Sequence, residues 1–132
     1  RLAPVSRPQE KDMIYDAISN SAVRLAENIG ADLMVCQTAS GVTASVIAAQ
    51  RPNLPIVSVT SNQRVANQLA LIYANSAFVR TYTETFGLDL AQELSASDYL
   101  KKREDRDYIL AVIVSGQQNV EGGTDTIQIR KV

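Results

Sequence analysis

The segment Cys36–Ser45, with the sequence CQTASGVTAS, gathers hydroxyl groups around a single glycine. Gly41 lets the backbone approach a ligand closely, and Ser40 and Thr43 supply hydroxyls that can donate hydrogen bonds. An apolar run precedes the segment and an alanine-rich stretch follows it. A helix is therefore expected to begin here, with its first amides unpaired and its dipole favouring negative charge. These features are typical of a loop that holds a phosphate group.

A simpler interpretation is open from the spacing alone. Ser40 would cap the following helix by accepting an amide hydrogen bond, and Thr43 would face solvent. The segment is not a Walker loop, because no Gly-Lys-Ser or Gly-Lys-Thr follows, and the chain contains no GxGxxG motif.

The chain lacks the residues that most enzymes use for proton transfer. It has no histidine and a single cysteine, Cys36. Ser-His-Asp and Cys-His catalysis are therefore excluded within it, and the commonest transition-metal ligand is missing. The apolar neighbours of Cys36 predict a buried, unreactive thiol. We expect no catalytic residue, no metal site and no cofactor in this chain, and a lone cysteine suits a reducing compartment such as the cytoplasm.

The composition is that of one globular domain. The chain has 132 residues, 45% hydrophobic and 20% charged, with a formal net charge of −1. Without a basic field, nucleic-acid binding is not expected, and no apolar run approaches the length that spans a bilayer. No signal peptide is visible. Residues 1–10, with two prolines, predict an extended lead-in, and residues 11–132 predict the domain.

Helical and strand patterns alternate along the chain. Apolar residues recur at helical spacing over Lys11–Ile29, Gly30 suits a left-handed helix cap, and Ser61 or Asn62 suits an N-cap. The expected helices cover residues 11–29, 40–50, 61–73 and 88–105, and the expected strands cover 31–36, 54–60, 76–82, 107–116 and 124–132. The pattern over 88–105 is broken, so Ser95 or Ser97 is expected to cap a second short helix.

This order predicts an α/β fold, a three-layer α-β-α sandwich around a mostly parallel five-stranded sheet. The last strand alternates apolar and polar residues, which favours an edge position or antiparallel pairing. Ligands of such sheets bind beyond the carboxyl ends of the strands. Those ends are small, polar and hydroxyl-bearing, and they are expected at Thr38–Gly41, Thr60–Asn62, Tyr82–Thr83 and Ser115–Gly116.

A second glycine-rich segment, GQQNVEGGTDT, lies between the last two strands. Gly122 and Gly123 fit an ordinary hairpin-like connection, and they also fit a flap that closes over a ligand. The segment KKRED at residues 101–105 mixes both charges, which favours a solvated helix end over a binding patch.

Four segments together resemble the C-terminal domain of pyruvate kinase from about Lys11 onward. TASGVTA resembles that family's T-x-S-G-x-S/T-A loop, and RPNLPIVSVT resembles its R-P-x-x-P-I-x-A-x-T segment. NQRVANQLAL resembles the helix that follows, and VIVSG with GGTDTIQI resembles the closing strands. Each segment alone is a weak signal, and their order and spacing make the set specific.

The resemblance implies a regulatory domain without catalytic residues. In that family, the domain often binds a sugar-phosphate effector, fructose 1,6-bisphosphate in many members, and it pairs with its twin across a two-fold interface within a tetramer. By matching positions, the phosphate would meet Thr38, Ala39, Ser40, Gly41 and Thr43, and a flap would include Gly122, Gly123 and Thr124. The barrel domain that transfers phosphate from phosphoenolpyruvate to ADP, with its Mg²⁺ and K⁺, lies outside this chain.

Two alternatives stay open. The first is a structural module that assembles with its partners and binds no effector. Ala39, where some members carry a basic residue, favours it, as do the carboxylates Glu121 and Asp125 near the expected flap. The second is a small stand-alone enzyme using the same crevice, which the missing histidine disfavours. If the domain binds a bisphosphate, Arg103 and Arg106 are poor substitutes for the arginine that usually binds the second phosphate.

Overall fold

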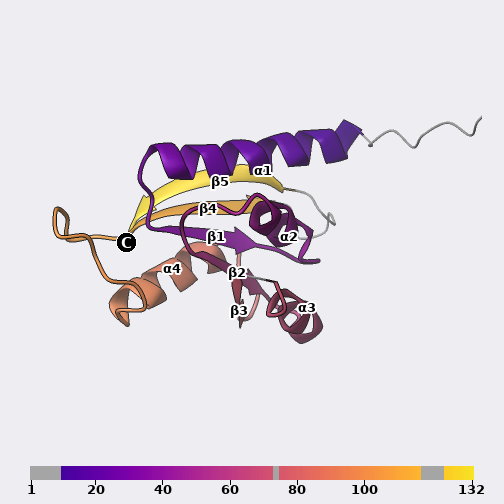
Figure 1. Cartoon of the computed structure of the whole chain (residues 1–132). Coiled ribbons are helices and arrows are strands. Elements are labelled where there is room, and N and C mark those ends of the chain that lie inside the picture. Colours follow the sequence, from indigo (N-terminus) through magenta and orange to yellow (C-terminus); the bar gives the residue numbers. More distant parts are fainter. Residues whose placement is uncertain (1–9, 73–74, 117–123) are drawn as a thin grey trace, which may run out of the picture.

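The computed structural model describes residues 10–72, 75–116 and 124–132. Helices and strands alternate until the last two strands, which follow each other directly (Figure 1). The elements are α1 (Glu10–Asn28), β1 (Leu33–Gln37), α2 (Val42–Ala49), β2 (Ile56–Thr60), α3 (Gln63–Leu69), β3 (Asn75–Val79), α4 (Phe86–Ala96), β4 (Leu110–Gly116) and β5 (Thr124–Lys131). The expected order of elements is confirmed.

The five strands form one sheet in the order β3-β2-β1-β4-β5. The first four are parallel to one another, and β5 pairs antiparallel with β4 at the edge of the sheet. β1 and β2 are largely apolar and buried because both of their faces are covered. β5 carries alternating polar residues because it is an edge strand with one neighbour.

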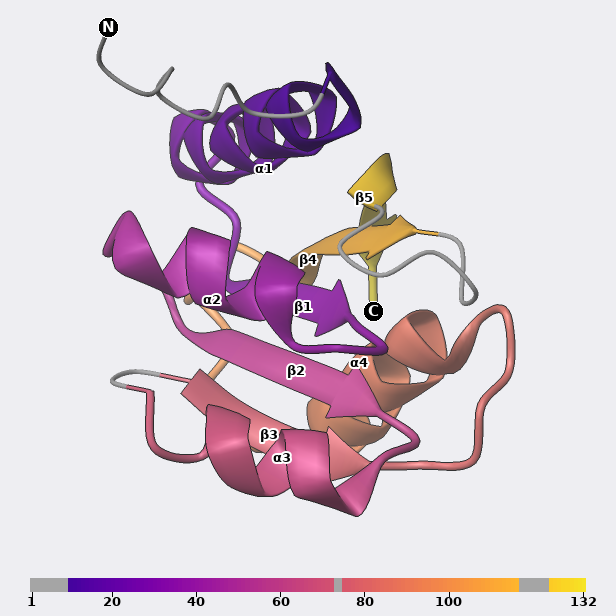
Figure 2. The same ribbon diagram turned by 90° about the vertical axis from the view of Figure 1, so that its right-hand side faces the viewer.

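Helices cover both faces of the sheet, as the three-layer prediction requires (Figures 1 and 2). α1, α2 and α3 pack on one face with Met34, Cys36, Ile56 and Val112. α4 packs on the other face, where its apolar side chains meet those of β1, β2 and β4. The buried residues of this second core are Leu33, Val35, Val57, Val59, Phe86, Leu90, Ala91, Leu94, Ile109, Ala111 and Ile113.

Local signals at two helix ends act as the sequence predicts. Gly30 has a φ of 67° and follows the end of α1, where a left-handed residue costs glycine little. Asn62, one of the two candidates, caps α3, since its side chain accepts hydrogen bonds from the amides of Arg64 (2.9 Å) and Val65 (3.3 Å).

Several boundary predictions are wrong, including the end of α3, which was expected at residue 73 and lies at Leu69. α4 begins at Phe86 rather than Leu88, and the chain from Ser97 to Ile109 contains no second helix. Ser97 is the C-cap of α4, and the left-handed Asp98 (φ 55°) reverses the chain there. β3 ends at Val79, three residues before the expected Tyr82. The expected lead-in at residues 1–10 lies outside the described residues except for Glu10, which opens α1.

Candidate functional site

The 38–43 loop, residues 38–43, lies where the strand order changes direction. β1 has β2 on one side and β4 on the other, so the chain leaves β1 to build one half of the sheet and returns to build the other. In the register of the sheet, Gln37 lies beside Val59 and Cys36 lies beside Val114. Ligands of open α/β sheets bind at this switch point, outside the carboxyl ends of the strands.

The loop is held by its own hydrogen bonds. Thr38 is buried, and its Oγ1 accepts a hydrogen bond of 2.7 Å from the amide of Gly41. Gly41 has a φ of 90° and precedes α2 as its N-cap. A Cβ at Gly41 would lie 3.2 Å from the side chain of Leu69, so the end of α3 supports the turn from behind. A hydroxyl can accept and donate at once, so Thr38 Oγ1 can also donate.

The structure corrects the capping interpretation. Gly41 rather than Ser40 is the N-cap, and no side chain caps α2 through a cap hydrogen bond. Ser40 Oγ accepts a long hydrogen bond of 3.4 Å from the amide of Val42. Thr43 is buried and engaged rather than solvent-facing. Ala39 is half-buried, and Val42 is exposed.

Other expected strand ends meet at the same end of the sheet as the loop, where the parallel strands have their carboxyl ends. Thr60 Oγ1 accepts a hydrogen bond of 3.2 Å from the amide of Asn62, and Ser115 and Gly116 end β4 beside β1. Tyr82 and Thr83 lie beyond β3, in the segment that leads to α4. Gly122 and Gly123 of the expected flap lie outside the described residues, and Thr124 opens β5 opposite Gly116.

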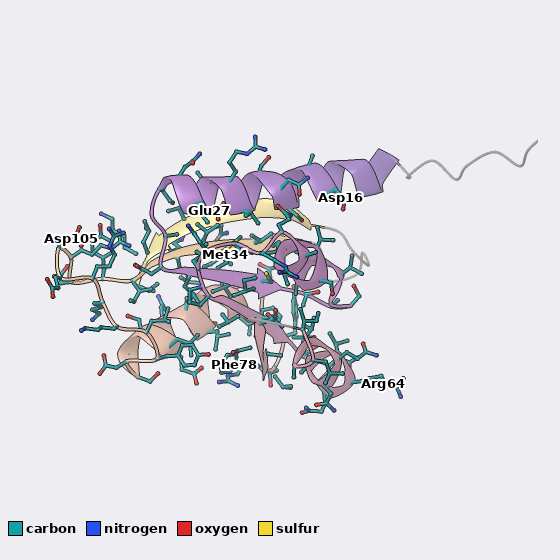
Figure 3. All side chains as sticks on the ribbon, in the orientation of Figure 1. Asp16, Glu27, Met34, Arg64, Phe78 and Asp105 are labelled. Carbon is teal, nitrogen blue, oxygen red and sulfur yellow. The ribbon has the colours of Figure 1, made fainter. Side chains whose placement is uncertain are left out.

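Arg103 and Arg106 lie at the opposite end of the strands, beside the amino end of β1. Arg106 Nη2 donates hydrogen bonds to Asp32 Oδ2 (2.6 Å) and to the carbonyl of Gly30 (2.8 Å), which Arg103 also contacts. Asp32 precedes β1, whereas Thr38 follows it, so about 20 Å of extended chain separates them. Figure 3 shows Asp105 of the same segment far from Arg64 on α3. Neither Arg103 nor Arg106 reaches the 38–43 loop.

The site carries binding groups and little acid–base chemistry. Burial raises the pKa of the Cys36 thiol to about 12, so it stays protonated and unreactive, as predicted. Among the residues that the structure describes, no three Cys, Asp or Glu side chains come together as metal ligands. In the same ranges, no helix is both long and apolar enough to cross a membrane.

Sequence reasoning missed Gln37. This residue ends β1, directly before the loop, and its side chain reaches the first turn of α4. Gln37 Oε1 accepts a hydrogen bond of 2.9 Å from the amide of Gly87, and Nε2 donates one of 3.4 Å to the carbonyl of Glu84. The available signals were a polar residue ending a buried strand and a glycine in the first turn of a helix.

Arg80 is a second residue that the sequence did not single out. Its guanidinium bonds Glu93 of α4 at 2.8 Å and lies 5.5 Å from the ring centre of Phe78. The same side chain donates to the carbonyl of Val79. Arg80 therefore ties the end of β3 to α4, and its guanidinium is engaged by Glu93 on the α4 side of the sheet.

The fold and the loop are matched by a known family model. The model described as "Pyruvate kinase, alpha/beta domain" matches residues 16–130. The chain belongs to the pyruvate kinase family. Within this pyruvate kinase domain the match includes the whole 38–43 loop and β1 to β4.

Named relatives agree. The pyruvate kinase of Geobacillus stearothermophilus is 32% identical over 123 residues, which cover 90% of this chain and 20% of the relative. That of Eimeria tenella is 34% identical over 98 residues, which cover 74% of this chain and 18% of the relative. A crystal structure of a pyruvate kinase from Cryptosporidium parvum superposes with a TM-score of 0.74 at 23% identity, over 96% of this chain and 24% of that chain. The pyruvate kinase domain described here thus spans about a fifth of the length of these curated relatives.

Proposed function

We propose that this domain binds a phosphorylated metabolite at the 38–43 loop and thereby regulates a pyruvate kinase. The catalytic barrel of that enzyme, which converts phosphoenolpyruvate and ADP to pyruvate and ATP with Mg²⁺ and K⁺, would lie outside this chain. The observation that carries the proposal is the position of the loop, at the switch point of the sheet and at the start of α2. Both features favour an anion at the same place.

The donors are the groups that the loop presents. Thr38 and Ser40 would donate from their hydroxyls, and the first amides of α2 would add backbone donors. Gly41 lets the backbone approach the phosphate without a side chain in the way. We expect a phosphate ester held by neutral hydroxyl and amide donors and by the helix dipole.

The test is calorimetry with inorganic phosphate, fructose 1,6-bisphosphate and AMP on the full chain and on two variants. Ser40→Ala removes a loop hydroxyl and is expected to weaken binding about five- to tenfold. Ser21→Ala, on the exposed surface of α1, is the matched control and should bind like the wild type. Absence of heat with every ligand at millimolar concentration would refute effector binding.

A structural module without an effector is the second candidate. The observation that favours it is the exposed Val42, whose side chain is 45% exposed at the first position of α2 and offers no charge to an anion. Ala39 likewise offers no polar side chain. The same calorimetry separates the two candidates, because this one predicts a stable domain that gives no heat.

Assembly is part of the proposal. β5 is an edge strand of eight residues, and such an edge pairs readily with another chain unless it is covered. We expect two copies to meet across a two-fold axis at β5 or at α1, which packs against it. The proposed compartment is the cytoplasm, in keeping with the protonated free thiol of Cys36.

A further inference from the structure

Gln37, the last residue of β1, and Thr38, which follows it, hold two different parts of the molecule. Side chains along a strand point alternately to opposite faces of the sheet. Thr38 faces the loop and fixes it through the 2.7 Å hydrogen bond from the amide of Gly41. Gln37 faces α4 and fixes its first turn through the hydrogen bonds with Gly87 and Glu84.

The contact between Gln37 and α4 is close enough to constrain both partners. A Cβ on Gly87 would lie 2.5 Å from Gln37 Oε1, 2.6 Å from Cγ and 2.9 Å from Cδ. The helix therefore approaches the glutamine along most of its side chain, which only a glycine at this position permits. Gln37 also satisfies one of the first amides of α4, which have no partner inside the helix.

α4 covers its face of the sheet alone among the described helices. Phe86 lies beside Gly87 in the first turn and is buried, and Leu90 and Leu94 continue the same buried stripe. A displacement of the first turn therefore reaches the core of that face. The segment from Arg80 to Thr85, which links β3 to α4, ends at the same turn.

We propose that Gln37 is a positioning residue that couples the 38–43 loop to the first turn of α4. An ordered loop stabilises the first turn of α4, and an ordered first turn stabilises the loop. A phosphate bound to the loop therefore protects the amides at the start of α4 from hydrogen exchange. The ligand half of this statement rests on the proposed function, while the link between loop and helix does not. Coupling of this kind is reciprocal. If bound phosphate stabilises the first turn of α4 by a given factor, then opening of that turn weakens the affinity for phosphate by the same factor.

The experiment measures amide hydrogen exchange by NMR on the full chain, with and without inorganic phosphate, at Gly41 and Gly87. Gln37→Met keeps the length of the side chain and removes the acceptor. We expect exchange at Gly87 to rise about tenfold, exchange at Gly41 to rise several-fold, and the Kd for phosphate to rise several-fold. Gln92→Met, on the exposed side of α4, is the control and should change none of the three.

Gln37→Glu tests whether the acceptor is what matters. Its carboxylate can accept the amide of Gly87, and negative charge is favourable at a helix N-terminus. Protection at Gly87 and at Gly41 should therefore return toward the wild-type level, and it should stop short of that level because a carboxylate cannot donate the hydrogen bond to the carbonyl of Glu84. Protection lost equally in the Met and Glu variants would show that the acceptor has no such role and would overturn the proposal.

The outcomes separate the coupling from the proposed function. A Gln37→Met protein with faster exchange at Gly87 but unchanged exchange at Gly41 and unchanged phosphate binding overturns the coupling and leaves the binding site standing. If the wild-type protein does not bind phosphate but Gln37→Met accelerates exchange at both Gly41 and Gly87, the binding site is refuted and the coupling is supported.

Discussion

For the substitution Gly87→Ala, helix propensity and tertiary packing predict opposite effects on the free energy of unfolding. Gly87 is the second residue of α4, and alanine is the better helix former by up to about 1 kcal/mol. Helix propensity alone therefore predicts a more stable protein. The structure predicts a less stable one, because the added Cβ would lie 2.5 Å from Gln37 Oε1 and 2.6 Å from its Cγ.

The magnitude follows from what Gln37 must give up. To clear the new methyl group, its side chain must rotate away and abandon the 2.9 Å hydrogen bond from the amide of Gly87. A buried amide left without a partner costs about 1–3 kcal/mol. After the gain in helix propensity is subtracted, Gly87→Ala is expected to lower the free energy of unfolding by about 1–2 kcal/mol.

The Gln37→Ala background reverses the expectation. With the long side chain gone, the methyl group added by Gly87→Ala has room, and the backbone amide of that residue has already lost its partner. Gly87→Ala should then be neutral or should stabilise by about 0.5–1 kcal/mol. The interaction free energy between the two positions is therefore about 2 kcal/mol, well above the roughly 0.3–0.5 kcal/mol scatter of independent sites.

Urea denaturation of the wild type, both single variants and the double variant measures this directly, provided that the m-value is unchanged. Equal effects of Gly87→Ala in the two backgrounds would refute the reasoning. They would show that the glutamine does not occupy the space against α4.

Three further predictions concern other regions. Burial raises the pKa of the Cys36 thiol to about 12. Above about pH 9 the unfolded chain loses this proton while the folded chain keeps it, so stability falls as the pH rises. Between about pH 8 and 10 the wild type should lose about 1–2 kcal/mol more than Cys36→Ala in urea titrations, and parallel losses would contradict this. Asp32→Ala leaves the largely buried Arg106 without the carboxylate that lies 2.6 Å from it. It should cost about 3 kcal/mol by the same assay, and a loss below about 1 kcal/mol would count against a structural pair. Ile129→Lys on β5, unlike Leu71→Lys next to α3, should shift the chain toward monomer in light scattering, and a monomeric wild type would exclude the expected dimer.

Much of the fold could be predicted because its signals are local. β1, β2 and β4 are apolar runs of the kind that a sheet covered on both faces accommodates. The alternation of β5 indicates its edge position. Gly30 and Asn62 mark helix ends through backbone freedom and side-chain capping, both of which act within a few residues. For these elements, the local preferences and the global packing agree.

The region around α4 was harder to predict, because its ends are set by distant partners. The first turn of α4 is held by Gln37, fifty positions away in the chain. Its last turn ends where Asp98 adopts a left-handed conformation, which no glycine or proline signals. Arg106 likewise bonds Asp32 across 74 positions, so its segment, predicted as a solvated helix end, is an irregular loop.

The residue types of the 38–43 loop were enough to predict its position, but they did not predict the role of the neighbouring Gln37. The topology of the sheet explains this difference. The chain passes from β3 through α4 to β4 and so crosses β2 and β1 on one face of the sheet. A parallel crossover brings the start of its helix to the carboxyl edge that it has just left. The first turn of α4 therefore starts at the end of the sheet where β1 also ends, and the structure places it beside Gln37. Once the strand order is known, a polar residue at that position and a glycine in that turn become an expected pair.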